Sequence, residues 1–289
     1  MEGTKKITLS KDDRKQIRPS EEDLFLSDVV ATPLSDWNPG RIFYVADNKA
    51  ILIFDQQGLP LNPDVAALGG QLLFYKATTE RRRPDGKIYA AIVFNDDKGN
   101  TYTYDTGKTI ETAPSAVMSD NIPMLIDMTM IQLANQFLAG RKLWTRSALR
   151  YDKDGNRIPG RKFVPVTIRH ALPGSIAFPL KVAYSDDRGE EGYAFLNFGN
   201  SGTDSRSFSH IFSLNDLRKK FPSITDEHWE LICNEKITLG MTKDECRLAL
   251  GNPTEVSAGH DYSQTLDLWH YPDGTVLWFE DGLLTRFRK

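Results

Sequence analysis

Short runs of β-branched and aromatic residues, separated by turn-forming clusters, restrict the fold of this chain more than any other feature. Between Trp37 and Gly107, Gly, Pro, Asn and Asp clusters separate such runs, which lie at 41–45, 50–54, 71–75, 90–94 and 101–104. Runs of this length and composition are typical of strands, and the clusters between them are typical of turns. We therefore predict a small sheet with a turn at 96–100.

Apolar residues at helical spacing interrupt this strand pattern from Met124 to Leu138. Such spacing places the apolar side chains on one face of a helix. Pro123 suits the first turn of that helix, and Gly140 suits the position after its end. A methionine-rich helix can serve as an adaptable binding surface, but a buried connector is commoner, and we interpret the helix as a connector.

The strand pattern returns after this helix and partly repeats the earlier one. Residues 68–74 have a counterpart at 138–144, and residues 93–99 have one at 183–189. In the second pair, a strand leads into an Asp-Asp-basic-Gly turn, and an aromatic strand follows. We infer a duplicated small β unit, whose second copy carries a longer insertion around 151–175.

The duplication makes two predictions about equivalent strands. Leu72 and Lys142 should begin equivalent strands, and so should Val93 and Ala183. Because turn chemistry recurs easily by chance, the strands must also agree in order and direction.

Two further helices are indicated near the end of the chain. Thr225 can cap the first helix through its hydroxyl group. Thr242 and Glu245 can form a capping box, in which the Thr242 hydroxyl accepts the Glu245 N–H and the carboxylate accepts the Thr242 N–H. The sequence at 251–253, Gly-Asn-Pro, then ends the second helix.

Three strands should follow these helices, with turns at 272–274 and 281–282. We therefore predict an α+β, mostly β fold, with two related small β units joined by a helix and followed by a helix-helix-three-strand module. The predicted strands lie at 266–271, 275–280 and 283–288. The predicted parts of the chain are a mobile arm (1–25), a first β unit (26–122), a linker helix with a second β unit (123–212) and the module (213–289).

Four short motifs occur in order within this module. They are Gly240-Met241-Thr242-Lys243-Asp244-Glu245, Leu250-Gly251-Asn252-Pro253, Trp269-His270-Tyr271 and Leu277-Trp278-Phe279-Glu280-Asp281-Gly282-Leu283. As a set, they resemble the SmpA/OmlA family, the BamE-like small outer-membrane lipoproteins, over residues 225–289. The resemblance implies a two-helix, three-strand fold that works by protein contact, without catalytic residues, usually in the envelope behind a lipidated cysteine. Fold transfers between relatives more safely than function.

Charge and motif content argue against several classes of function. The chain has 36 basic and 39 acidic residues, a net charge of −3, which offers no large cationic field to nucleic acid. It has no apolar run long enough for a membrane-spanning helix. Phosphate loops, dinucleotide fingerprints and nucleophile elbows do not occur, and the five histidines lack metal-ligand spacing. We therefore expect no catalytic residue, no cofactor and no bound metal.

The two cysteines, Cys233 and Cys246, fall on the apolar stripes of the two C-terminal helices. Helices joined by a short connection pack against each other, so the two thiols should lie close together. We favour buried, reduced thiols that act as small apolar side chains, whereas export of the protein would favour a disulfide.

Alternation along the C-terminal strands gives their sheet two apolar faces. The face expected to pack against the helices carries Trp269, Tyr271, Leu277 and Phe279. The opposite face carries Leu268, His270, Val276 and Trp278. Two short helices cover one face only, so either the rest of the chain or a partner should cover the second. We name this second face as the partner-binding site, with Trp278 as its anchor, because large aromatic residues supply most of the energy at such contacts.

We hypothesise a non-catalytic binding or scaffold protein of the bacterial cell envelope, with another protein as its partner. One alternative is a glycan- or peptide-binding module that uses an aromatic groove of a β unit. Another is a hydrolase whose site is assembled from distant residues. A leader ahead of Met1 would place the protein in the periplasm or on the outer membrane with a lipid anchor, whereas Met1 as the genuine start would place it in the cytoplasm.

Overall fold

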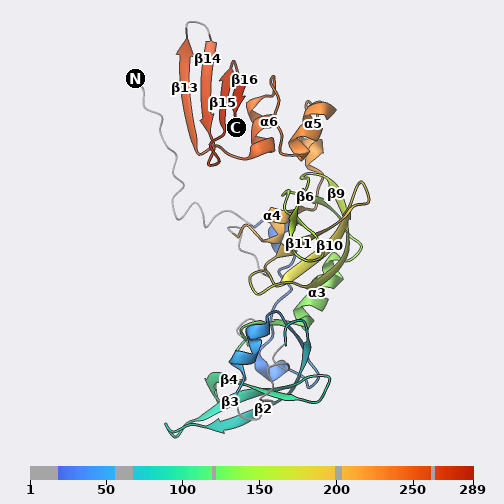
Figure 1. Cartoon of the computed structure of the whole chain (residues 1–289), viewed down its shortest axis with the longest axis vertical. Coiled ribbons are helices and arrows are strands. Elements are labelled where there is room, and N and C mark those ends of the chain that lie inside the picture. Colours follow the sequence, from blue (N-terminus) through green and yellow to red (C-terminus); the bar gives the residue numbers. More distant parts are fainter. Residues whose placement is uncertain (1–18, 56–67, 119–121, 199–203, 262–263) are drawn as a thin grey trace. The chain divides into compact units, whose positions relative to one another are not determined.

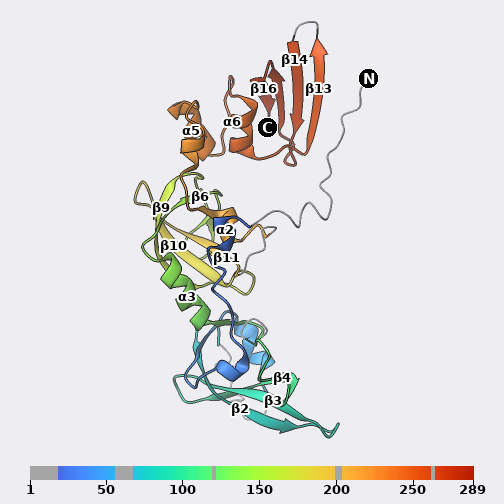
Figure 2. The same cartoon turned by 180° about the vertical axis from the view of Figure 1, so that it is seen from behind.

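The short β-branched and aromatic runs form antiparallel strands in three separate sheets (Figure 1), which Figure 2 shows from behind. The fold is α+β and mostly β, as the strand runs predicted. This computed structural model describes residues 19–55, 68–118, 122–198, 204–261 and 264–289.

The chain divides into two compact units. Unit 1 comprises Met1–Phe137 and Asn197–Ser209, and unit 2 comprises Leu138–Leu196 and His210–Lys289. Both units are discontinuous in sequence, because the chain returns to unit 1 after Leu196 and leaves it again after Ser209.

Unit 1 holds a five-stranded sheet in the order β4-β3-β2-β1-β5. The first four strands pair in sequence as antiparallel neighbours, and β5 returns to pair with the free side of β1. The strands are β1 (Ile42–Val45), β2 (Leu72–Arg82), β3 (Ile88–Asn95), β4 (Thr101–Thr109) and β5 (Leu125–Asp127).

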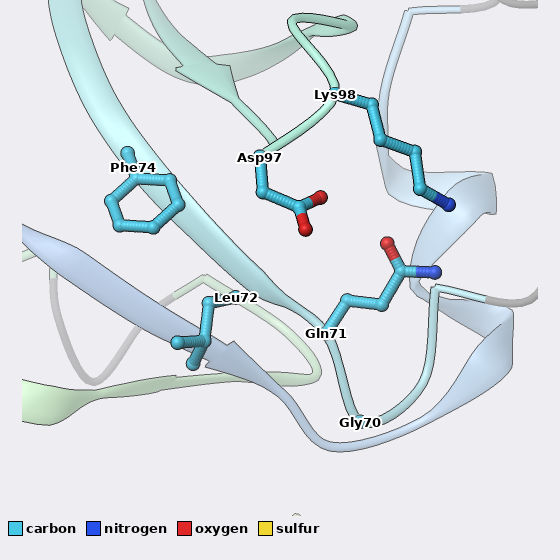
Figure 3. Close-up of a pocket in the computed structure, with 6 residues that line it drawn as sticks. All are labelled: Gly70, Gln71, Leu72, Phe74, Asp97 and Lys98. Atoms are coloured by element: carbon cyan, nitrogen blue, oxygen red, sulfur yellow. The ribbon is translucent and has the colours of Figure 1, made fainter.

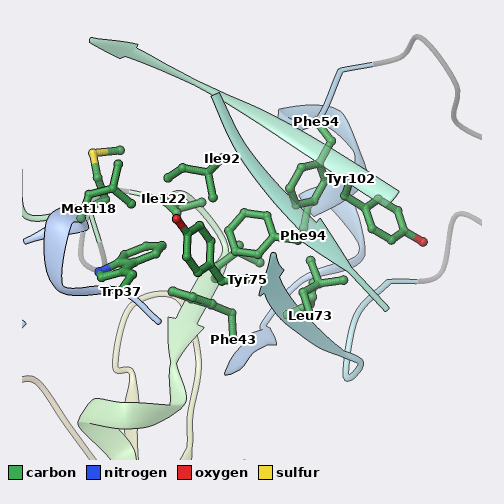
Figure 4. Close-up of a cluster of buried hydrophobic side chains, with 14 of the residues drawn as sticks. Trp37, Phe43, Phe54, Leu73, Tyr75, Ile92, Phe94, Tyr102, Met118 and Ile122 are labelled. Carbon is green, nitrogen blue, oxygen red and sulfur yellow. The ribbon is translucent and has the colours of Figure 1, made fainter. Parts of the chain in front are cut away.

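Aromatic side chains form much of the core of unit 1 (Figure 4). Trp37 lies with its ring centroid 4.9 Å from that of Phe43 and meets Tyr75 edge-on at 5.4 Å. Phe94 contacts both Phe43 and Phe54 edge-on, at 5.3 and 6.1 Å. Aliphatic side chains fill the space around these rings, including Leu73, Ile92, Met118 and Ile122.

The predicted arm at 1–25 lies outside the described residues up to residue 18, and its end forms the helix α2 (Glu21–Leu24). Ser20 and Asp23 form a capping box at the start of this helix. Phe25 stacks on Phe208, with ring centroids 4.3 Å apart.

The strand predicted at 50–54 was wrong, because this segment lies in the 3-10 helix η2 (Asn48–Ile53). The Asp47 carboxylate accepts the Lys49 N–H and fixes the first turn. Ala50 is buried in the core, while Leu52 is 71% exposed. Short apolar runs do not distinguish a strand from a helical turn, and only Phe54 forms an isolated bridge, to Tyr104.

The linker helix begins later than predicted. It is α3 (Met128–Leu138), and the predicted first turn, with Pro123, is not helical. The preceding residues form β5 instead, where Asp127 stops the strand because its carboxylate accepts the Thr129 N–H at 2.9 Å. Gly140 does follow the helix, with a φ of 77° that favours glycine.

Unit 2 holds a seven-stranded sheet in the order β12-β6-β9-β10-β11-β7-β8. Its strands are β6 (Lys142–Thr145), β7 (Arg150–Tyr151), β8 (Arg157–Ile158), β9 (Pro165–Pro173), β10 (Leu180–Asp186), β11 (Glu191–Leu196) and β12 (Phe212–Ser213). The short helix α4 (Phe208–Ile211) leads into β12, and the 3-10 helix η4 (Leu217–Lys220) follows it.

Five strands of this sheet repeat the order found in unit 1. The order β11-β10-β9-β6-β12 corresponds to β4-β3-β2-β1-β5, while β7 and β8 are added at the β11 edge. Tyr75 of β2 and Ile168 of β9 occupy equivalent positions in the two sheets. Tyr75 accepts the Gly40 N–H at 2.7 Å, and Ile168 accepts the Gly140 N–H at 2.9 Å.

The two predicted equivalences have different outcomes. Val93 and Ala183 both lie beside an irregularity in the pairing, between Tyr75 and Ala77 in one sheet and between Ala183 and Tyr184 in the other. They occupy equivalent positions on equivalent strands, but neither begins its strand as predicted, because β3 begins at Ile88 and β10 at Leu180. The pairing of Leu72 with Lys142 was wrong, because Lys142 begins β6, whereas Leu72 begins β2, the counterpart of β9.

A helix pair and a third sheet complete unit 2. The helices are α5 (Asp226–Cys233) and α6 (Lys243–Leu250). Thr225 caps α5, and Thr242 and Glu245 form the predicted capping box of α6. The sheet has four strands rather than the predicted three, in the order β13 (Glu255–Asp261), β14 (Gln264–His270), β15 (Val276–Glu280) and β16 (Leu283–Arg288). The prediction missed β13 because its centre, Ser-Ala-Gly, has low strand propensity.

Candidate binding surfaces

The inner face of the C-terminal sheet packs against the helix pair, as alternation predicted. Trp269, Leu277 and Phe279 are fully buried and share a cluster with Met241 and Cys246 of the helical segment. The rings of Trp269 and Phe279 lie 4.7 Å apart. This cluster fixes which side chains point away from the helices.

The four residues predicted to bind a partner lie together on the outer face of this sheet. Leu268 stands opposite Trp278, and His270 stands opposite Val276, in the pairing of β14 with β15. Leu268, His270 and Trp278 are half-buried, whereas Val276 is only 5% exposed. Val276 is therefore covered within the monomer and offers no surface to a partner. The accessible part of the predicted site is the Leu268–Trp278 end.

A groove of about 300 Å³ lies at that end of the outer face. Leu266, Leu268 and Trp278 contribute apolar surface, and Leu266 is 36% exposed. The edge strand β13 contributes Ser257 and Gly259, whose small size leaves the groove open. Other residues that line it are Ala258, Asp267, Phe279 and Glu280. The guanidinium of Arg286 stacks 3.9 Å from the centroid of the Trp278 ring, which holds the indole in one orientation.

A second hollow, of about 410 Å³, opens on the sheet of unit 1 (Figure 3). It lies where the start of β2 meets the turn between β3 and β4 (Figure 3). Leu72 and Phe74 form its apolar side, while the side chains of Gln71, Asp97 and Lys98 line its other side. Leu72 is 39% exposed, although it lies on a central strand of the sheet.

Asp96 holds the turn that presents the polar side of this hollow. Its carboxylate accepts the N–H groups of Lys98 and Asn100, at 3.0 and 2.8 Å, and the Tyr102 hydroxyl at 3.1 Å. Burial would raise the pKa of Asp96, but hydrogen bonds from Asn100, Tyr102 and Lys98 outweigh burial and hold that pKa below its ordinary value. Asp97 and Lys98 therefore project into solvent from a fixed backbone.

The segment 161–163, which lies between β8 and β9, contacts both α5 and α6. The Lys162 N–H donates to the carbonyl of Cys233 at the end of α5, and its ammonium donates to the carbonyl of Ala249 near the end of α6. A cation at these carbonyls complements the partial negative charge of a helix C-terminus. Burial lowers the pKa of Lys162, and Glu235, with its Oε1 3.9 Å from Nζ, offsets part of that effect.

Both cysteines are buried and unbridged. Burial raises the pKa of Cys233 to about 11 and that of Cys246 to about 12. Such thiols are poor nucleophiles at neutral pH. They pack as small apolar groups, which is the arrangement that the sequence favoured.

Within the described residues, no three His, Cys, Asp or Glu side chains are grouped so as to hold a metal ion. No helix in the described part of the chain is both long enough and apolar enough to cross a membrane.

The sequence did not predict the hollow on unit 1, because residues 96–100 indicated only a turn. The available signal was at 69–74, where two glycines precede a strand whose outward positions, Leu72 and Phe74, are apolar. An apolar outward face on a half-exposed sheet indicates a covered or binding surface.

Comparison of the chain with protein-family models, with curated proteins and with solved structures finds no match.

Proposed function

We propose that this chain is a non-catalytic binding protein whose partner docks on the outer face of the C-terminal sheet. The groove between Leu266, Leu268 and Trp278 supports the proposal, since it is an accessible apolar surface on a face that the helices leave uncovered. A half-exposed sheet face that serves no binding role is ordinarily polar. An extended apolar segment of another protein suits this groove, with Trp278 as the residue that contributes most to binding.

We also propose that the helix pair and its sheet form a BamE-like module, and that the protein works in the bacterial cell envelope. Four sequence motifs support the proposal, together with the Thr242–Glu245 capping box and the turn at Gly251, where φ is 85°. The additional edge strand β13 departs from the three strands that the family leads one to expect. The proposed activity is contact with protein, as in that family.

The sheet of unit 1 and the larger sheet of unit 2 are proposed copies of one duplicated β unit. Their shared five-strand order and the matching irregularities beside Val93 and Ala183 support a common origin. In this proposal, the copies are scaffolds that carry binding surfaces.

A site-specific photo-crosslinker tests the docking surface in cells. The photoreactive residue p-benzoylphenylalanine would replace Leu268 in the groove or, as a matched control, Thr285, which is exposed on β16 and does not line the groove. We expect a discrete adduct from position 268 alone, and its loss when Trp278→Ala is added. Thermal unfolding of each purified variant would establish that the fold is retained.

Equal adducts from both positions, or an adduct that persists with Trp278→Ala, would contradict the docking surface. Fractionation of the same cells tests location separately. If the protein expressed from its natural gene were recovered in the cytosolic fraction, the envelope proposal would be contradicted. The proposed docking surface would not be affected by that result.

A second candidate function is peptide or glycan binding by a β unit. The hollow beside Phe74 favours it, because an aromatic ring there adjoins an amide, a carboxylate and an ammonium group.

A further inference from the structure

Gly70 and Phe163 occupy the same position in the two related sheets. The Gly70 N–H donates to the carbonyl of Val45 at 2.8 Å, and the Phe163 N–H donates to the carbonyl of Thr145 at 2.6 Å. Both residues have a left-handed backbone, with φ of 83° and 58°. Gly70 lies just ahead of β2, which pairs with β1. Phe163 lies just ahead of β9, which pairs with β6.

The turns beside these positions also match. Asp96 and Asp186 each accept the N–H groups of the residues two and four positions ahead, at 2.8–3.0 Å. The two carboxyls therefore fix the same turn. Asp97 corresponds to Asp187, and Lys98 corresponds to Arg188, so that each turn presents one acid followed by one base.

On the second sheet, helix α5 covers this surface. The Phe163 ring lies 5.8 Å from the ring of Trp229. Arg188 pairs with Glu230 at 2.9 Å. Arg161 joins the two sides, at 2.9 Å from Asp187 and 3.0 Å from Glu230. Trp229 of α5 thus docks on Phe163, the residue ahead of the strand. The acid that follows it, Glu230, docks on the turn through Arg188.

On the first sheet, the same place is the hollow of Figure 3. Gly70 has no side chain where Phe163 has a ring, and a Cβ added to Gly70 would meet nothing within 4 Å. Lys98 supplies the cation that corresponds to Arg188. Leu72 and Phe74 supply an apolar surface for an aromatic side chain.

We propose that this hollow binds a short helix of a partner protein that presents an aromatic residue next to an acidic one, as α5 presents Trp229 and Glu230. The aromatic side chain enters the space beside Gly70 and Phe74, and the acid pairs with Lys98. Asp97 receives a basic side chain in the role that Arg161 has on the second sheet. This site is separate from the C-terminal groove, and neither proposal depends on the other.

The helix on the second sheet supplies the probe. A fluorescein-labelled, N-acetylated peptide of residues 223–237, with Cys233→Ser, would be titrated with the full chain by fluorescence anisotropy. We expect saturable binding that is weakened about tenfold by Lys98→Glu, because the change reverses the charge opposite Glu230. Lys108→Glu, an exposed charge reversal on β4 away from the hollow, is the matched control and should leave binding unchanged.

Changes in the peptide complete the test. Trp229→Ala in the peptide should abolish binding, and Glu230→Lys in the peptide should restore binding to the Lys98→Glu protein. In amide spectra, shifts of Gly70 and Lys98 would support the proposal. Shifts confined to Arg161 and Arg188 would show displacement of α5 on the second sheet and would overturn it.

Two other results would also overturn the proposal. One is peptide binding that is insensitive to Lys98→Glu. The other is a soluble glycan, chitotetraose, that shifts the Gly70 and Lys98 amides when the peptide does not, since this would make the hollow a glycan site. Trp278→Ala should not alter any of these measurements, so failure here is distinguishable from failure of the C-terminal docking surface.

Discussion

The ammonium group of Lys162 donates a hydrogen bond to the backbone carbonyl of Ala249, and this contact joins the segment ahead of β9 to the end of α6. The side chain is only 8% exposed, so the charge is held largely away from water. Its pKa is lowered by burial, with partial compensation from Glu235. The contact therefore places a helix-capping cation where its charged form is disfavoured.

Lys162→Met should change how stability depends on pH. A pKa that is lower in the folded chain than in the unfolded chain means that stability increases as pH rises through the folded pKa toward the ordinary value, 10.5. The free energy of unfolding of the wild-type protein should therefore increase relative to that of Lys162→Met as pH rises toward 10.5. Urea titrations at several pH values measure this difference. Lys220→Met, an exposed change, should show no such trend.

Arg41→Met should destabilise the protein by about 3 kcal/mol, because it leaves the carboxylate of Asp127 buried without its ion-pair partner. The side chains of Arg41 and Asp127 are 8% and 1% exposed. The pair also fixes β5, whose last residue is Asp127. Chemical denaturation checks the value, with Arg82→Met, an exposed change on β2, as the control. A loss no larger than that of the control would mean that the pair contributes nothing net.

Asp96→Asn should cost about 1–3 kcal/mol, since the turn loses a charged acceptor for four hydrogen bonds. The pKa of Asp96 is lowered in the folded chain, so its contribution is fully present above the unfolded value of about 3.9 and is lost as pH falls through the folded value. The gap between wild type and variant should therefore narrow below about pH 4. Asp152→Asn, in a similar but more exposed turn, should cost less.

The two thiols should be inert in the folded protein. Burial raises the pKa of Cys233 to about 11 and that of Cys246 to about 12, so little thiolate is present at pH 8. Ellman's reagent should report no free thiol under native conditions and two per chain in guanidinium chloride. Rapid native reaction of either residue would contradict the burial described for the helix pair.

Local signals predicted the C-terminal module best. The cap of α6 depends on Thr242 and Glu245, three positions apart, and both capping hydrogen bonds form as the sequence indicated. Alternation assigned Trp269 and Phe279 to the buried face for the same reason, because the strand period is a local property. Val276 was misjudged, since its neighbours in space, rather than in sequence, cover it.

Signals that depend on distant contacts were misread or missed. The repeat was aligned on Leu72 and Lys142, although Gly40-Arg41 and Gly140-Arg141 mark the true correspondence of β1 with β6. The hollow on unit 1 arises where residues 70–74 meet residues 97 and 98, and no short pattern encodes that meeting. Sequence periodicity predicts which side chains share a face of a strand or helix, whereas a hollow depends on how strands and turns pack against one another.

The return of β5 to β1 has a consequence for the order in which unit 1 folds. Val45 pairs with Leu125, and most of the sequence of unit 1 lies between these two residues. Arg82, in contrast, pairs with Ile88 across a short connection. Closing the longer loop costs more chain entropy, so we expect the hairpins of β2, β3 and β4 to form before β5 pairs with β1. We therefore expect the contacts of β5 to be absent from the folding transition state, so that weakening them would speed unfolding without slowing folding. On this expectation, the strand that completes the sheet would set the lifetime of the folded unit rather than the rate at which it forms.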